Sequence, residues 1–322
     1  MKIRNKFLCL FGSSRLYPFY FASLILLIIY YPVFFQGKLA VNDSDALELH
    51  IPNNYFVAQS YKQGRLPVWN LYFNLGQPVS DGTTPLFHPG LIFYLFLDPF
   101  LANTVEILSG LFLACVGIWY FLSSLGFTLF SVLVGSLIYI LIGPVFFQHS
   151  YHLGFMAIVL LPWCLYLFHQ YDSTRRFRWL SGGIILSILA VHSLDPDLLI
   201  YVFLGLFIDR IVTAPKKNRF RYLSMWVGVF LLSLFTGLVN FLPFHQWLQY
   251  SSRTLHNYGG ILTPGITNLL FAIFANTWFT PYPYTDVFYL YIGIIPLWLA
   301  LMSLLSFSKN EYVSRYFVYT LI

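Results

Sequence analysis

Apolar runs of about 20 residues recur along this chain, and they constrain its fold more than any other feature. The first run, residues 17–36, contains no charged residue, and a helix of that length can cross the hydrocarbon core of a bilayer. Further runs lie at 102–124, 127–147, 154–171, 180–194, 197–213, 222–243 and 286–307, and a last one begins near residue 315. They predict an all-α membrane protein, a polytopic helical bundle with about eight or nine transmembrane helices.

The composition excludes a soluble globular domain. Hydrophobic residues make up 58% of the chain and charged residues 9%, whereas a soluble domain carries about 25% charged residues. The net charge of +6 does not indicate nucleic-acid binding, because the basic residues lie in short clusters between apolar runs. If the N-terminus is cytoplasmic, most of them fall on the cytoplasmic side, as the positive-inside rule requires. Those residues are Lys2, Arg4, Lys6, Arg15, Arg175, Arg176, Arg178, Arg210, Lys216, Lys217, Arg219, Arg221, Lys309 and Arg315.

Two long segments are then expected on the outer side, residues 37–100 and residues 244–285. Within the first, Asp45 to Gly64 predicts a helix along the membrane surface, interrupted by Pro52. The apolar stretch at 86–100 is short and contains two prolines, so it predicts a re-entrant or interfacial segment.

Residues 1–322 are interpreted as one transmembrane domain, the N-terminal part of a longer protein, because the last apolar run stops at Ile322. A cleaved signal peptide is the alternative reading of the first run. The length of that run and the lack of a small-residue cleavage site favour a retained helix.

The sequence Asp43-Ser44-Asp45 follows the first predicted span. Two neighbouring carboxylates can share a divalent cation such as Mg²⁺ or Mn²⁺. One of them can also act as a general base if the other raises its pKa. The alternative is a solvated turn that caps the helix expected to begin near Ala46.

Aromatic and amide side chains gather between residues 64 and 78. Trp69 can stack on the face of a sugar, and Asn70 and Gln77 can hydrogen-bond its hydroxyls. The alternative is an aromatic anchor at the membrane interface.

Histidines and acids near other outer helix ends suggest further metal ligands. His149 and His152 share a face if that segment is helical, and His192 is followed by Asp195 and Asp197. Structural turns explain these residues equally well. Arg253 lies beyond a helix break expected at Leu242-Pro243, where its guanidinium could bind a phosphate or neutralise an acid.

Several stretches, in this order, resemble the YfhO-like membrane proteins of the GT-C glycosyltransferase superfamily. They are Asp43 to Asp45, Gly64 to Asn70, Gly76-Gln77-Pro78, His88-Pro89, His152-Leu153-Gly154, Leu161-Pro162-Trp163, Leu242-Pro243 with Ser251-Ser252-Arg253, and Tyr291-Ile292-Gly293. The resemblance extends along nearly the whole chain.

The resemblance implies a multispan enzyme of a bacterial inner membrane that takes sugar from a polyprenyl-phosphate donor and inverts the anomeric centre. Asp45 or Asp43 would be catalytic, and a divalent metal would be held by Asp43, Asp45, His152 and Asp195. The expected substrate-binding residues are Arg253, Trp69, Asn70, Gln77 and His88. An envelope glycan, a lipid or a protein would accept the sugar on the outer face, in contact with membrane lipids.

Two other functions stay open. A transporter or lipid flippase would carry charges near the membrane midplane, where this sequence has few. A non-catalytic envelope-assembly protein would use its outer loops to bind a partner.

Overall fold

A computed structural model describes residues 16–40, 46–72, 76–79, 86–141, 155–193, 196–214 and 219–248. This part of the chain is almost entirely helical, with one two-stranded antiparallel sheet. The elements are α2 (Tyr17–Ile29), α3 (Tyr31–Gln36), the π-helical η2 (Ala46–His50), α4 (Ile51–Lys62), β1 (Trp69–Asn70), β2 (Gln77–Pro78), α5 (Leu91–Phe96), α6 (Pro99–Ser124), α7 (Leu129–Leu141), α9 (Phe155–Thr174), α10 (Phe177–Val191), α11 (Pro196–Thr213) and α12 (Arg219–Leu248).

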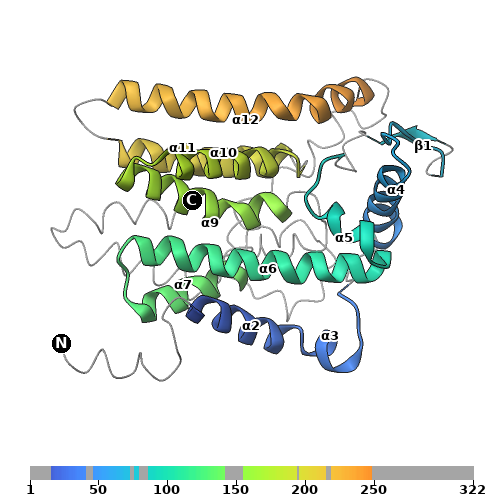
Figure 1. The fold of residues 1–322 in the computed structure, drawn as a ribbon, viewed down its shortest axis with the longest axis horizontal. Coiled ribbons are helices and arrows are strands. Elements are labelled where there is room, and N and C mark those ends of the chain that lie inside the picture. The colour runs from blue at the N-terminus through green and yellow to red at the C-terminus, as the bar shows by residue number, and fades with distance from the viewer. Residues whose placement is uncertain are drawn as a thin grey trace, which may run out of the picture.

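The long helices lie side by side, and α4 lies across one end of them (Figure 1). We call this end, with η2, α4, α5 and the β1–β2 hairpin, the cap end. The opposite end holds the α9–α10 turn and the first residues of α12, and we call it the basic end because Arg175, Arg176, Arg178, Arg219 and Arg221 are there.

Two hydrophobic clusters form the interior, and α9 contributes to both. In the first cluster, Phe155 and Val159 of α9 pack with residues of α2, α6 and α7. In the second cluster, Cys164 and Phe168 of α9 pack with residues of α10, α11 and α12. α9 is therefore the central helix of the described bundle.

The first predicted span is two helices rather than one. α2 ends at Ile29, and α3 begins at Tyr31 with a proline, Pro32, in its first turn. Proline lacks an N–H and its ring meets the carbonyl one turn earlier. A continuous helix through Pro32 would lack the backbone hydrogen bond that this N–H normally donates to that carbonyl, so the chain bends at Tyr30.

The predicted break at Leu242-Pro243 is wrong. α12 continues through Pro243 and ends at Leu248. A proline removes only one backbone hydrogen bond, and packing of the rest of a long helix can outweigh that loss. The helix expected across residues 45–64 is present as η2 and α4, and Pro52 lies in the first turn of α4, directly after the π-helical turn of η2.

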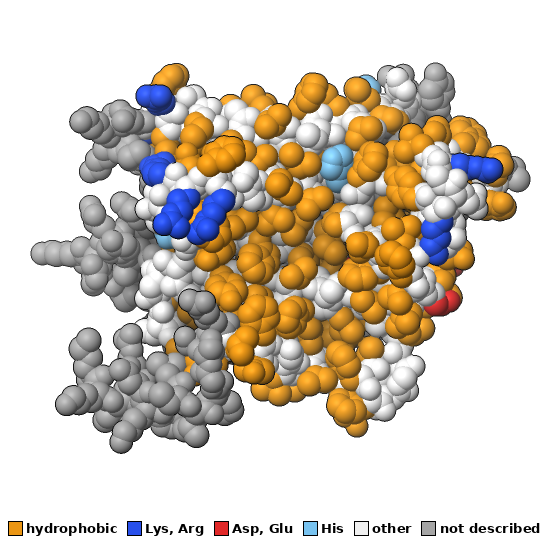
Figure 2. All heavy atoms as spheres, in the orientation of Figure 1, with side chains coloured by type: hydrophobic (Ala, Val, Ile, Leu, Met, Phe, Trp, Pro, Cys, Tyr) orange, Lys and Arg blue, Asp and Glu red, His pale blue; other side chains and the backbone are white. Residues whose placement is uncertain are grey.

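Two described helices are long and apolar enough to cross a membrane, Pro99–Ser124 and Arg219–Pro243. Shorter apolar helices are Tyr17–Ile29, Leu129–Leu141 and Phe177–Val191. Large apolar side chains of α12 are exposed, for example Leu231 (60%) and Phe235 (70%). On the face in Figure 2, Lys and Arg side chains lie near both ends and a broad hydrophobic band separates them. Lipid, not water, suits such a surface.

The prediction of a mostly helical protein is confirmed for the described residues, and two of its helices are candidate membrane spans. The expected span at 286–307, the last apolar run and the second long segment beyond Leu248 lie outside the described residues.

Candidate functional site

A glycine ends α4 and directs the chain into the hairpin. Gly64 has a φ of +68°, in the left-handed region, which glycine adopts without strain. The Gly64 N–H donates to the Tyr61 carbonyl and the Arg65 N–H donates to the Ser60 carbonyl, both at 2.9 Å. This pair of bonds is the Schellman motif that closes many helices, and it fixes the backbone of Arg65 against α4.

The hairpin that follows holds three of the predicted residues, Trp69, Asn70 and Gln77. Trp69 pairs with Pro78 and Asn70 pairs with Gln77, and the Val79 N–H donates to the Val68 carbonyl. Because side chains alternate along a strand, Trp69 is half exposed while Asn70 is buried.

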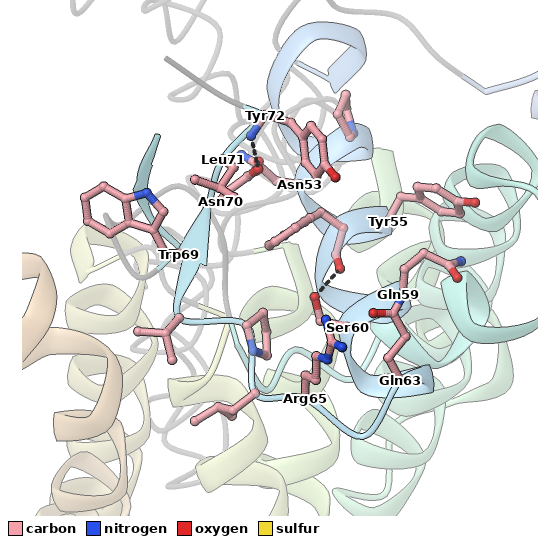
Figure 3. Close-up of a pocket in the computed structure, with 15 residues that line it drawn as sticks. Asn53, Tyr55, Gln59, Ser60, Gln63, Arg65, Trp69, Asn70, Leu71 and Tyr72 are labelled. Atoms are coloured by element: carbon pink, nitrogen blue, oxygen red, sulfur yellow. Dashed lines mark hydrogen bonds between the residues drawn. The ribbon is translucent and has the colours of Figure 1, made fainter. Parts of the chain in front are cut away.

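A cavity of about 670 Å³ lies between this hairpin and one face of α4. Figure 3 shows Trp69 and Asn70 on the strand side, Asn53 and Ser60 on the helix, and Arg65 in the chain that joins them. The lining residues are Pro52, Asn53, Tyr55, Phe56, Gln59, Ser60, Gln63, Arg65, Leu66, Pro67, Val68, Trp69, Asn70, Leu71 and Tyr72. Amide, hydroxyl and aromatic side chains are frequent among these described lining residues, and none of the residues is acidic.

Two asparagines connect the helix wall of this pocket to the strand wall. Asn70 donates through Nδ2 to Oδ1 of Asn53 at 2.8 Å, and Oδ1 of Asn70 accepts from the Tyr72 N–H at 3.0 Å. Asn53 is 3% exposed, and its Nδ2 has no hydrogen-bond partner within the described part of the chain. A buried amide donor without a partner is costly, so Asn53 is suited to donate to a ligand.

A second polar group lies behind α4, away from the pocket. His88 Nε2 and Glu106 Oε1 form a hydrogen bond, and both side chains are buried. Gly90 packs so closely against them that a Cβ at this position would overlap the Glu106 carboxylate. The pair joins the segment before α5 to the first turns of α6.

Two tyrosines, Tyr61 and Tyr94, lie in the same region and remain protonated. Tyr61 donates to the Leu86 carbonyl at 2.6 Å, and burial raises the pKa of Tyr61. Burial, and then the charge of Glu106, raise the pKa of Tyr94, while a hydrogen bond with Asn54 lowers it. Both phenols therefore stay protonated at neutral pH.

The start of α6 also fixes the chain that follows α3. The Ala40 N–H donates to Thr104 Oγ1 at 3.1 Å, and Asn103 Nδ2 donates to the Ala40 carbonyl at 2.9 Å. Asn103 and Thr104 are buried. These bonds hold the segment that leads directly to Asp43.

Five predicted site residues lie outside the described residues: Asp43, Asp45, His152, Asp195 and Arg253. The predicted metal site is therefore untested. Among the residues that the structure describes, no three or more His, Cys, Asp or Glu side chains form a group able to hold a metal ion.

The other predicted residues divide into two sets. Trp69 and Asn70 line the pocket, whereas Gln77 and His88 are not among its lining residues. Gln77 pairs with Asn70 across the hairpin, and His88 is held by Glu106. Sequence reasoning did not identify Asn53 or the role of Glu106. An acid within the apolar run at 102–124 was the available signal, since such residues are costly unless paired.

The basic end carries a different cluster, built around a buried arginine. Arg210 donates to Asp172 and Asp209, and its guanidinium lies 4.9 Å from the ring centroid of Trp226. Tyr222 donates to Asp172 at 2.6 Å. These contacts join α9, α11 and α12 near their ends, away from the middle of the bundle, where a transport pathway would need its charges.

No family model matches the chain, and no curated protein and no solved structure shows a significant similarity to it. The resemblance to the YfhO-like proteins thus stays a prediction drawn from the residues themselves.

Proposed function

We propose that the chain is a multi-pass membrane glycosyltransferase of the GT-C type, which transfers a sugar from a polyprenyl-phosphate donor to an acceptor on the outer face. The observation that carries the proposal is the pocket at the cap end. Its lining combines an exposed indole, Trp69, with the amides of Asn53, Gln59, Gln63 and Asn70. Amides pair with sugar hydroxyls as donor and acceptor at once, and an indole covers the apolar face of a sugar ring.

The placement of this pocket supports a reaction at a membrane surface. It lies at one end of a bundle whose middle is hydrophobic (Figure 2). The arginines of the α9–α10 turn and of the first turn of α12 lie at the other end. Under the positive-inside rule the basic end is cytoplasmic and the pocket faces outward. About eight or nine spans and a bacterial inner membrane belong to the same proposal.

In the proposed mechanism, the pocket positions a saccharide and a carboxylate of the first loop activates the acceptor hydroxyl. Asp45, or Asp43, takes the hydroxyl proton as the acceptor oxygen bonds to the anomeric carbon. The bond from that carbon to the donor phosphate breaks with inversion, and Arg253 stabilises the departing lipid phosphate. The hydrogen bonds of Ala40 with Asn103 and Thr104 support this assignment, because they fix the chain three residues before Asp43.

A divalent cation, Mg²⁺ or Mn²⁺, is proposed as cofactor on the donor atoms of Asp43, Asp45, Asp195 and His152. Carboxylate oxygens are the ligands such hard cations prefer. When bound, the cation would neutralise phosphate charge.

The experiment that tests this function is sugar transfer in isolated membranes, with a panel of labelled polyprenyl-phosphate sugars as donors. Wild type is compared with Asp45→Asn at matched expression, and Glu48→Gln serves as the control because Glu48 is an exposed acid of the same loop. Transfer by wild type and Glu48→Gln, but not by Asp45→Asn, is the expected result. Full transfer by Asp45→Asn would overturn the assignment of the base.

The alternatives predict different outcomes. An envelope-assembly protein would bind saccharide at the pocket without transferring it, and its outer carboxylates would tolerate replacement. A transporter or flippase would move labelled lipid across reconstituted vesicles without forming a new glycosidic bond.

A further inference from the structure

The described lining of the candidate pocket contains one cation, Arg65. Arg65 is the single charged residue among the pocket's lining residues. Its side chain is exposed and, within the described residues, makes no ion pair. We infer that the pocket selects an acidic saccharide, one that carries a carboxylate or a phosphate ester on the sugar, and that Arg65 binds this group. The inference rests on the proposed function, since it specifies the sugar that the pocket holds.

The position of Arg65 is set before any ligand arrives. Its N–H donates to the Ser60 carbonyl at 2.9 Å, as part of the bonds that close α4, and Pro67 follows two residues later. The guanidinium therefore projects from a fixed backbone. A fixed backbone reduces the entropy that is lost when a ligand binds, and the planar fork of the guanidinium matches the two oxygens of a carboxylate or phosphate.

The electrostatics of the pocket favour an anion because none of the described residues that line it is acidic and could neutralise Arg65. The described acids of the same end, Glu48, Asp98 and Glu106, do not line the pocket. In the same structure Arg210 is surrounded by Asp172 and Asp209. An arginine that serves only to join protein segments is expected to have such partners.

The remaining lining residues indicate that the anion is attached to a sugar. Asn53 is only 3% exposed, and its Nδ2 donor lacks a hydrogen-bond partner among the described atoms. Trp69 lies on the opposite wall with its indole against Gly76, where a Cβ would meet Nε1 at 2.7 Å. A bare anion would need neither a hydroxyl-binding amide nor a stacking surface.

Lys62 provides a matched control. It is also exposed and lies three positions before Arg65, but it does not line the pocket. A general attraction of anions to this basic surface would depend on both cations equally and would be screened by salt. Recognition in the pocket would depend on Arg65 alone.

The test is a binding titration of the purified chain in nanodiscs of zwitterionic lipid. The probes are two matched pairs, glucose with glucuronate and galactose with galacturonate, together with glucose 6-phosphate and inorganic phosphate. Wild type, Arg65→Gln, Arg65→Lys and Lys62→Gln are compared. Thermal unfolding of each variant verifies folding, and these exposed positions are expected to tolerate the changes.

The acidic sugar of at least one pair should bind about tenfold more tightly than its neutral partner, the effect of one charge-assisted interaction. Arg65→Gln should remove this preference, Arg65→Lys should keep part of it, and Lys62→Gln should keep all of it. Preference for glucose 6-phosphate over the uronates would identify a phosphate ester as the recognised group, and the reverse would identify a carboxylate.

Three results would overturn the inference. Equal binding of neutral and acidic sugars would show that the pocket ignores charge, and the proposed function would survive. Inorganic phosphate that binds as tightly as any sugar would show an anion site without saccharide recognition. Equal losses in Lys62→Gln and Arg65→Gln would show surface attraction only. Failure of every sugar to bind would instead contradict the proposed function itself.

Discussion

Two arginines, one at each end of the bundle, show how differently this chain uses the same side chain. Arg210 at the basic end is completely buried and engages Asp172, Asp209 and the Trp226 ring. Arg65 at the cap end is exposed, and the part of its pocket that the structure describes is lined by no acid. The charge of Arg210 is neutralised within the protein, whereas that of Arg65 is available to a ligand. Replacing each should therefore affect a different property.

The largest effect is expected from Arg210→Ala. Removing one partner from a buried ionic cluster leaves the other charges without compensation, and the cost is about 3–5 kcal/mol in the free energy of unfolding. Denaturant unfolding of the detergent-purified protein measures this loss. Arg175→Ala is the control, because Arg175 contacts the same Asp172 at 3.5 Å from an exposed position, and its loss should cost at most about 0.5 kcal/mol. Equal stability of Arg210→Ala and wild type would contradict a structural role for the cluster.

The next effect concerns the buried pair behind α4. Glu106→Ala would leave the His88 imidazole buried without its partner, and the free energy of unfolding should fall by about 2–3 kcal/mol. Glu106→Gln keeps an acceptor for His88 and should cost about 1 kcal/mol. Sugar binding to the folded variants should persist, since neither residue lines the pocket. A folded Glu106→Ala protein that no longer binds sugar would instead make this pair part of the site.

Local features of the cap end could be predicted from sequence, and long-range ones could not. The surface helix, its end at Gly64 and the turns around Gly76 follow from residues a few positions apart. The hydrogen bond between Asn53 and Asn70 joins residues from a helix and a strand, and no periodicity indicates it. The break at Tyr30 follows from Pro32, yet a similar proline, Pro243, leaves α12 intact. Tertiary packing decides between these outcomes.

A smaller effect, on sugar binding, is expected to differ between two neighbouring asparagines. Asn53 lines the pocket, whereas Asn54 is buried without lining it, and its side chain lowers the pKa of Tyr94. Asn53→Ala should weaken sugar binding about tenfold, the equivalent of one hydrogen bond of about 1.4 kcal/mol. Asn54→Ala should lower stability and leave the dissociation constant of the sugar unchanged. Calorimetric titration of both variants measures the contrast, and equal binding losses would mean that α4 does not divide the two polar groups.

The smallest effect is expected at Tyr61, which links α4 to the segment before His88. Tyr61→Phe removes the hydrogen bond to the Leu86 carbonyl and should cost about 1 kcal/mol at neutral pH. The pKa of Tyr61 is raised in the folded protein, so the unfolded chain loses this proton first. Its contribution is therefore complete below the unfolded pKa, near 10, and is lost as the pH rises through the folded pKa. Alkaline unfolding of Tyr61→Phe should consequently be less steep than that of wild type, although Tyr94 will keep part of the pH dependence. Identical alkaline profiles would show that the link between α4 and Leu86 does not contribute to the stability of the cap end.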